Sequence, residues 1–262
     1  MLRMLTYLLK EGVATTPRLP LTLPAETRSL PKLTENPCTT GCDICEKICP
    51  TDAIVLEGTD LGTALKIDLG ACINCSLCIT NCPSGTIASD NSVATARLNR
   101  SDLILSKPNE SQPKQSHEGS TEKTSNKVST GNSIFRRSIA CRVISTGCAA
   151  CDLELAACSN PIFDMERFGI SIVASPRFAD VLLITGAVPK SMHQALKSCY
   201  MAMSEPRKVI AVGTCACSGG LHKGGYAEAN GVSDLLPVDI FVPGCPPHPW
   251  SIVEALLRLM NN

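Results

Sequence analysis

Two kinds of hydrophobic pattern divide the chain. In the C-terminal part, apolar runs that end at glycine or cysteine predict strands buried on both faces of a sheet, as in ADVLLITG and KVIAVGTC. IACRVIST and VDIFVPGC are further strand candidates, KSMHQALKSCYMAM has helical spacing, and PWSIVEALLRLM opens with a proline that the first helical turn accepts. Because strands and helices alternate, residues 138–262 are predicted to form an α/β domain around a parallel sheet.

The first 36 residues carry a weaker pattern. Apolar residues within 1–12 recur at helical spacing, and a proline-dotted stretch that we expect to be extended follows up to residue 36. The short helix is predicted either to cover the neighbouring domain or to lie against a membrane partner. No run approaches the roughly 18 apolar residues of a membrane span, and MLRMLTYLLKEG lacks the apolar core of a signal peptide. We therefore expect a cytosolic chain.

A polar stretch separates two cysteine-bearing regions. SKPNESQPKQSHEGSTEKTSNKVSTGNS has hardly a hydrophobic residue, so it cannot bury enough surface to offset the entropy that ordering would cost. Residues 91–137 are therefore predicted to be a flexible linker between a domain at residues 37–90 and the α/β domain.

Composition narrows the possible chemistry. The chain has 262 residues, 16 of them cysteine, and its 24 basic residues balance 24 acidic ones. The balanced charge and the 3% of aromatic residues argue against a nucleic-acid partner. In a cytosolic chain the thiols are expected to be reduced, which favours metal sites over disulfides.

Residues 37–90 contain an internal repeat of cysteines. CTTGCDICEKICPTDAI and CINCSLCITNCPSGTI both contain Cys-Pro, and the second has the spacing of a bacterial-type ferredoxin, in which the fourth cysteine serves the other cluster. An α+β ferredoxin domain with two [4Fe–4S] clusters is therefore predicted. The expected ligands are Cys38, Cys42, Cys45 and Cys82 for cluster 1, and Cys72, Cys75, Cys78 and Cys49 for cluster 2.

The first half of the repeat departs from the usual spacing by one residue. Three residues rather than two separate Cys38 from Cys42, and Gly41 is expected to absorb the extra residue in a tight turn. Zinc and disulfides are the alternative uses of these eight cysteines, but zinc sites rarely show an interleaved Cys-Pro repeat.

Four further cysteines lie in turns marked by glycine or proline. STGCAACD, VGTCACSGG and VPGCPPHP contain Cys148, Cys151, Cys215 and Cys245. Cys215 and Cys245 follow the carboxyl ends of two predicted strands, which is where ligands bind in open α/β sheets. Glycine beside a site lets the backbone approach a bulky inorganic cluster closely.

These segments, together with NPIFDMERFGI and ASPRFADVLLITG, resemble the [NiFe]-hydrogenase small subunit and its homologue in respiratory complex I. The resemblance covers nearly all of residues 134–262. It implies a flavodoxin-like sheet whose proximal [4Fe–4S] cluster is ligated by Cys148, Cys151, Cys215 and Cys245.

The spacing of the first two of these ligands distinguishes branches of the family. Complex I members place the two cysteines side by side, whereas Ala149 and Ala150 separate Cys148 from Cys151 here. That spacing is similar to membrane-bound energy-converting hydrogenases such as formate hydrogenlyase, although those usually have Asn-Gly between the cysteines. The ferredoxin region resembles a separate subunit of the same complexes.

The resemblance implies an electron-transfer small subunit of a membrane-associated [NiFe] hydrogenase or formate hydrogenlyase-like complex. Such a chain would be peripheral, on the cytoplasmic side of the membrane, beside membrane-arm subunits. It would relay electrons through three [4Fe–4S] clusters between a dehydrogenase or ferredoxin donor and a [NiFe] large subunit, without a catalytic residue of its own. The alternatives are a complex I-like NADH or ferredoxin:quinone oxidoreductase subunit and a non-catalytic redox-sensing iron–sulfur protein.

Other residues near these sites have less specific roles. Core packing is expected for Cys141, Cys158, Cys199 and Cys217, with Cys217 as an alternative ligand and Cys141 with Cys158 as an alternative redox pair. His248 is a candidate for tuning the third cluster. Asp152 and Glu154 are expected to be helix-start charges, with a proton path as the alternative for Glu154.

Overall fold

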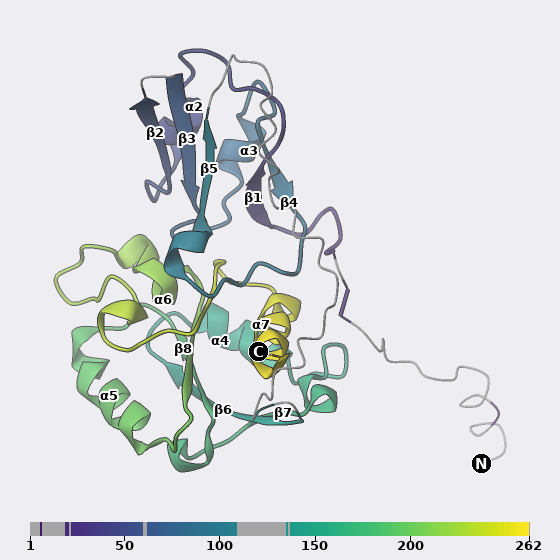
Figure 1. The fold of residues 1–262 in the computed structure, drawn as a ribbon, viewed down its shortest axis with the longest axis vertical. Helices are drawn as coiled ribbons and strands as arrows, with labels where there is room; N and C mark the ends of the chain where they lie inside the picture. Colours follow the sequence, from purple (N-terminus) through teal and green to yellow (C-terminus); the bar gives the residue numbers. More distant parts are fainter. Residues whose placement is uncertain are drawn as a thin grey trace.

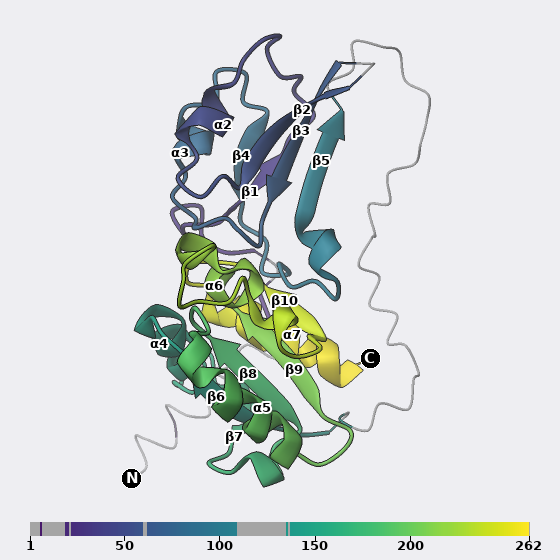
Figure 2. The ribbon, with the colours of Figure 1, turned by 90° about the vertical axis from the view of Figure 1, so that its left-hand side faces the viewer.

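The computed structural model describes residues 6, 19–20, 22–59, 62–108, 135 and 137–261. These residues form two bodies, the smaller built mainly from residues before 109 and the larger from residues after 136 (Figure 1). Both views place the smaller body on the end of the larger one at which α6 (Thr214–Ser218) lies (Figure 2). The helix predicted within residues 1–12, apart from Thr6, and the stretch 109–134 lie outside the described residues.

Five parallel strands form the sheet of the larger body, in the order β10-β9-β8-β6-β7. The strands are β6 (Ile139–Ser145), β7 (Ile170–Ile172), β8 (Val181–Thr185), β9 (Lys208–Val212) and β10 (Ile240–Val242). This order is that of flavodoxin-like sheets, whose ligand crevice opens between the first and third strands, here β6 and β8. The predicted α/β fold is confirmed, and β7 is the one strand of this sheet that the apolar pattern did not predict.

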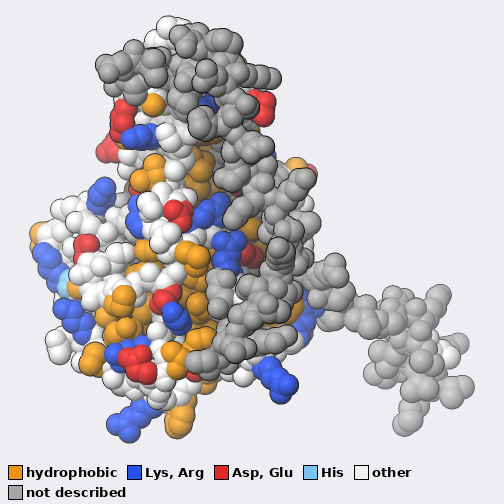
Figure 3. Space-filling model, in the orientation of Figure 1, with side chains coloured by type: hydrophobic (Ala, Val, Ile, Leu, Met, Phe, Trp, Pro, Cys, Tyr) orange, Lys and Arg blue, Asp and Glu red, His pale blue; other side chains and the backbone are white. Residues whose placement is uncertain are grey.

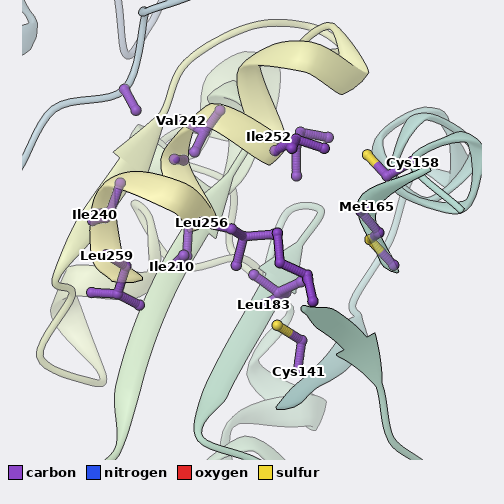
Figure 4. Packing of buried hydrophobic residues seen from close by; sticks show 14 of the residues in the cluster. Cys141, Cys158, Met165, Leu183, Ile210, Ile240, Val242, Ile252, Leu256 and Leu259 are labelled. Atoms are coloured by element: carbon purple, nitrogen blue, oxygen red, sulfur yellow. The ribbon is translucent and has the colours of Figure 1, made fainter. Parts of the chain in front are cut away.

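Helices cover both faces of this sheet. α4 (Ala149–Ala157) and α7 (Pro249–Asn261) pack on one face, and α5 (His193–Ala202) and α6 pack on the other. On the first face, Leu256 of α7 lies toward Leu183 and Ile210 of the sheet (Figure 4). Side chains on both faces of β8 are fully buried, as expected for a parallel sheet with two covered faces.

Short 3-10 helices occupy the connections of the larger body. They are η2 (Met165–Phe168), η3 (Pro176–Phe178), η4 (Lys190–Met192), η5 (Gly220–His222) and η6 (Val232–Asp234). Across the described part of the chain, no helix has both the length and the apolar character needed to cross a membrane.

The smaller body combines two antiparallel sheets with two short helices. β1 pairs with β4, and β2, β3 and β5 form a three-stranded sheet. The elements are β1 (Leu30–Leu33), α2 (Ile44–Ile48), β2 (Ile54–Thr59), β3 (Gly62–Asp68), α3 (Leu77–Thr80), β4 (Ile87–Asp90) and β5 (Ile104–Pro108). Each helix lies within one of the two cysteine runs, so this α+β body has the predicted duplicated arrangement.

The ferredoxin-type body extends beyond its predicted limits of 37–90. β1 comes from the predicted leader, and β5 comes from the predicted linker and pairs with β3. A 3-10 helix, η1 (Arg100–Leu103), precedes β5 and buries Leu103 completely. The predicted start of the linker at residue 91 is therefore wrong, because residues 91–108 pack against elements that are distant in the sequence.

Hydrogen bonds and apolar packing join the two bodies, in addition to the connecting chain. Arg97 and Phe241 of β10 exchange backbone hydrogen bonds of 2.9 and 2.8 Å, so the chain leaving β4 runs along the outer edge of the larger sheet. Ala96 is fully buried in the core of the larger body, and Arg258 of α7 donates to its carbonyl at 3.0 Å. A second apolar cluster is continuous from Leu103 to Cys217 of α6. The smaller body is therefore docked on the larger one.

Candidate metal centres

Site 1 lies in the smaller body and gathers four thiols from both cysteine runs. Cys38, Cys42 and Cys45 of the first run line one cavity together with Cys82 of the second run. Burial, followed by the neighbouring Cys38, raises the pKa of Cys45 to about 11. For Cys82, burial acts to raise the pKa, but hydrogen bonds from the backbone of Ile87 and the hydroxyl of Ser84 outweigh it and lower the pKa. These donors stabilise a thiolate at residue 82.

The extra residue in the first run is accommodated as expected. Gly41 has φ +74, a conformation that glycine adopts without strain, and the amide of Cys42 donates to the carbonyl of Thr39 at 3.1 Å. A Cβ added at Gly41 would meet no atom within 4 Å, so the turn requires glycine for its backbone angles and not for space.

Site 2 is the reciprocal arrangement. Cys72, Cys75 and Cys78 of the second run line a cavity with Cys49, the last cysteine of the first run. Burial is the main cause that raises the pKa of Cys72 to about 12 and that of Cys78 to about 11. The Sγ atom of Cys49 accepts a hydrogen bond of 3.3 Å from the amide of Ala53. The structure thus brings the eight cysteines together in the two predicted groups of four.

Site 3 lies at the carboxyl edge of the larger sheet. Three strands, β6, β9 and β10, each place a cysteine at the third residue after the strand ends, at Cys148, Cys215 and Cys245. Cys151 follows on the first turn of α4, and burial, then the thiols of Cys245, Cys215 and Cys148, raises its pKa to about 12. Cys148 and Cys245 are exposed whereas Cys151 is buried, so the site is open to the surface on one side.

Two glycines make room for the thiols of this site. Gly213 has φ +91, and a Cβ there would lie 2.5 Å from the Sγ atom of Cys151. A Cβ on Gly220, which has φ +52, would lie 3.0 Å from the Sγ atom of Cys215. Side chains at these positions would occupy the space in which the cysteines meet, which is the close approach expected from the glycine-marked turns.

Asp152 does more than the helix-start charge that its position predicts. Its carboxylate accepts hydrogen bonds from the hydroxyl of Ser145, the last residue of β6, and from the hydroxyl of Thr185, the last residue of β8. The helix that carries Cys151 is thereby fastened to two strand ends. Glu154, in contrast, has its pKa raised by burial alone.

The remaining four cysteines do not belong to the three groups of thiols. Cys141 and Cys158 are fully buried in the core of the larger body. The thiol of Cys217 lies 3.8 Å from the carbonyl of Ala211 and 3.7 Å from that of Val242, so its hydrogen-bond partners are strand carbonyls, although it is near enough to interact electrostatically with Cys151. Cys199 on α5 is half-buried.

His248 is held by its neighbours near site 3. Its Nδ1 atom accepts a hydrogen bond of 3.2 Å from the amide of Trp250, and its ring packs edge-to-face on Phe163. Burial lowers its pKa, so it is a neutral ring near Cys245 at pH 7. Glycine-marked turns predict the cysteines of site 3 from the sequence, whereas no sequence signal distinguishes the supporting role of Asp152.

The donor set of each site fits an iron–sulfur cubane. Each site gathers four cysteine thiols, which is the usual ligand set of a [4Fe–4S] cluster. Among the residues that the structure describes, no three His, Cys, Asp or Glu side chains converge closely enough to hold a single metal ion. A cubane distributes its ligands over four iron atoms and therefore accommodates the wider separation. A ferredoxin-type body docked on a flavodoxin-like body with such sites defines an iron–sulfur electron-transfer protein.

Residues 148–259 match the family described as NADH ubiquinone oxidoreductase, 20 Kd subunit, and residues 37–86 match the 4Fe-4S dicluster domain. The chain belongs to that oxidoreductase subunit family and carries an N-terminal dicluster domain. It is therefore an iron–sulfur electron-transfer subunit of this oxidoreductase family.

Similar proteins include both uncharacterised and named ones. An uncharacterised protein of Methanocaldococcus jannaschii is 46% identical over 128 residues, which cover 48% of this chain and 86% of that protein. The NADH-quinone oxidoreductase B subunit of Citrifermentans bemidjiense is 44% identical over 116 residues, 44% of this chain and 68% of that protein. A chain of the membrane-bound sulfane sulfur reductase, an archaeal respiratory membrane complex, is 28% identical with a TM-score of 0.43, covering 49% of this chain and 73% of that chain.

Proposed function

We propose that sites 1, 2 and 3 each hold one [4Fe–4S] cluster and that the chain conducts single electrons between a donor and a partner subunit. The observation that carries this proposal is the grouping of twelve cysteines into three sets of four, two of which line cavities. When bound, the clusters supply the ability to take up and release one electron each. The chain's own residues hold the clusters, exclude water and donate hydrogen bonds to sulfur, as Ala53 does to Cys49.

Site 3 is the proposed exit toward a partner subunit. Cys148 and Cys245 are exposed, and Leu221, whose backbone donates to the thiol of Cys215, is 61% exposed. Leu153, on the helix that carries Cys151, is 69% exposed. Apolar side chains also interrupt the polar surface of the larger body in Figure 3. The surface formed by Cys148, Cys245, Leu153 and Leu221 is suited to burial against another protein beside the cluster.

We assign that partner to the [NiFe] large-subunit class, with membrane-arm subunits completing a complex to which this chain is peripheral on the cytoplasmic side. The support is the spacing Cys148-Ala149-Ala150-Cys151, which is similar to that of energy-converting hydrogenases and formate hydrogenlyase. The electron donor would then be a dehydrogenase module or a ferredoxin that reaches site 1.

A second candidate is a complex I-like subunit that passes electrons toward a quinone. The names of relatives favour it, since several proteins about as similar as the one from Citrifermentans bemidjiense are NADH-quinone oxidoreductase B subunits. The separated cysteines at the first ligand position count against it.

Iron analysis and one pair of variants test the clusters. The anaerobically purified chain is expected to hold about 12 irons, four for each cubane. Cys245→Ser should remove one of three EPR signals, whereas Cys217→Ala, two residues from another proposed ligand but with its thiol turned into the sheet, should keep all three. A native, iron-free chain would refute the proposal, and three signals in Cys245→Ser would refute the assignment of site 3.

Isolation of the complex discriminates the two candidate partners. A co-purifying large subunit with nickel-ligating cysteines, together with hydrogen evolution from a low-potential donor, would support the hydrogenase assignment. A large subunit without those cysteines, together with quinone reduction, would support the second candidate and exclude the first.

A further inference from the structure

The surface between the two bodies contains a polar seam between one loop and one helix. On the loop, residues 68–72 lead from β3 to Cys72 of site 2. On the helix, Thr214 donates to the carbonyl of Cys72 at 2.7 Å, and Ser218 donates to the carbonyl of Gly70 at 2.7 Å. Both hydroxyls belong to α6, which also carries Cys215 of site 3. The seam therefore connects a proposed ligand of one cluster with the helix that bears a proposed ligand of the next.

Of the two seam hydrogen bonds, the one from Thr214 gives the more direct bonded route between the proposed ligands Cys72 and Cys215. From the Sγ atom of Cys72, covalent bonds lead to its carbonyl oxygen, one hydrogen bond crosses to the Oγ1 atom of Thr214, and one peptide bond leads on to Cys215. The side chain of Thr214 is only 1% exposed, so no bulk water competes for its hydroxyl. The hydrogen bond from Ser218 ends at Gly70 instead, two residues before the ligand, and lies off this path.

We propose that Thr214 is a positioning residue that couples site 2 to site 3 electronically, in addition to joining the two bodies. The inference rests on the proposed function, since it needs clusters at both sites. With clusters held by the thiols of sites 2 and 3, one electron would pass from a reduced cluster at site 2, which would be oxidised, to an oxidised cluster at site 3, which would be reduced. No bond forms or breaks, and no proton is transferred. The hydroxyl of Thr214 replaces a through-space gap with a hydrogen bond to the carbonyl of Cys72.

The test uses the full chain with all clusters bound, in four forms: wild type, Thr214→Val, Thr214→Ser and Ser218→Ala. Valine keeps the shape of threonine and removes the donor, serine keeps the donor, and Ser218→Ala deletes a seam hydrogen bond of the same length off the path. After flash photoreduction, the phase that is independent of donor concentration reports electron equilibration between sites. The dipolar interaction between the reduced clusters, measured by EPR, reports the distance between them.

Thr214→Val is expected to slow this phase several-fold at unchanged dipolar interaction and unchanged cluster potentials, because the lost bond goes to a carbonyl and not to a sulfur. Thr214→Ser and Ser218→Ala should equilibrate as the wild type does. An unchanged rate in Thr214→Val would overturn the inference. So would equal slowing in Ser218→Ala, or slowing that accompanies a weaker dipolar interaction, because either would reduce Thr214 to a contact that only holds the bodies together.

Two further results keep the inference separate from the proposed function. If the wild type lacks about 12 irons or three cluster signals, the proposed function fails and not the role of Thr214. Thr214→Ala guards against crowding by the valine methyl group, and it must show the same slowing as Thr214→Val for the inference to stand. Hydrogen exchange of the backbone amides in residues 69–73 reports whether the seam stays closed without any cluster activity, and faster exchange there in Thr214→Val than in Ser218→Ala would overturn the inference.

Discussion

The guanidinium of Arg100 holds the carboxylate of Asp68 with two hydrogen bonds, 2.8 Å from Nη1 and 2.6 Å from Nη2. Its Nε atom donates at 3.2 Å to the carbonyl of Cys217 on α6. One side chain therefore joins η1, the end of β3 and the larger body. Only a planar group with several fixed donors can satisfy these acceptors together.

Arg100→Lys is expected to lower the free energy of unfolding by about 1–3 kcal/mol. An ammonium group cannot reproduce the paired contact with Asp68 together with the hydrogen bond to Cys217, and hydrogen bonds to charged groups are among the stronger ones. Urea unfolding of the holoprotein measures it. Lys47→Gln provides the control: its ion pair with Asp43 is also 2.6 Å long, but the lysine side chain is 74% exposed. That substitution should leave the free energy of unfolding close to the wild-type value, because solvent screens an exposed ion pair. Equal losses in both variants would contradict the bridging role of Arg100.

Cleavage of the chain within residues 109–134 is expected to leave the two fragments bound to each other. The N-terminal fragment would carry Arg97, which exchanges two backbone hydrogen bonds with Phe241, and Ala96, which is buried in the core of the other fragment. A protease site inserted after Ser120 and size-exclusion chromatography of the cut protein measure this. Arg97→Pro in the cut protein removes one of those hydrogen bonds and should weaken the complex. If the fragments of the cut wild-type protein separated at micromolar concentration, the two bodies would be held together only by the connecting chain.

Gly213→Ala is expected to prevent cluster assembly at site 3, because its Cβ would lie 2.5 Å from the Sγ atom of Cys151. The iron content should fall from about 12 to about 8 per chain, the loss of one cubane. Gly224→Ala is a matched control, since Gly224 also has a positive φ, +77, but a Cβ there would meet no atom within 4 Å. Both variants bear the strain of a positive φ, so loss of iron in both would mean that backbone strain, and not the clash with Cys151, is responsible.

The thiol of Cys141 is expected to make the fold less stable at high pH. Burial, followed by the carboxylate of Asp180, raises its pKa from the ordinary value of 9.0 to about 12. Between these values the unfolded chain releases the thiol proton while the folded chain keeps it. The free energy of unfolding therefore falls as the pH rises, by up to about 1.4 kcal/mol per pH unit.

Cys141→Ala should therefore lose less stability than the wild type between pH 8.5 and 10.5, as measured by urea unfolding at both pH values. Ile139→Val, a truncation at another buried position of β6, should show the same fall as the wild type because it leaves the thiol in place. An equal fall in Cys141→Ala and in the wild type would show that other groups cause the alkaline loss.

The grouping of the cysteines could be predicted because the signal lies in short stretches of sequence. A Cys-Pro repeat with fixed spacing indicates which thiols share a cluster, and apolar runs locate the strand ends that precede Cys215 and Cys245. The docking of the smaller body was not predictable in this way. Arg100 is 32 residues from Asp68 and 117 residues from Cys217 in the sequence, and nothing local to Arg100 distinguishes it from a surface residue.

The structured part of residues 91–137 was missed for a related reason. β5 is only five residues long and runs directly into a polar stretch, so the mean composition of the segment concealed it. Its order comes from pairing with β3 and from the fully buried Leu103. Asp152 is similar: its sequence position indicates a helix start, while its two hydroxyl partners come from the ends of β6 and β8.

The strand order sets the distance between the two strands that lead to Cys148 and Cys215 of site 3. β8 lies between β6 and β9 and contributes no cysteine, so the strands that lead to Cys148 and Cys215 are two spacings apart, roughly 10 Å at about 4.8 Å per spacing. Loops transplanted onto a sheet in which those two strands are neighbours would start from about half that separation. An engineer who wishes to move this centre into another scaffold must therefore transfer the empty middle strand as well as the cysteines.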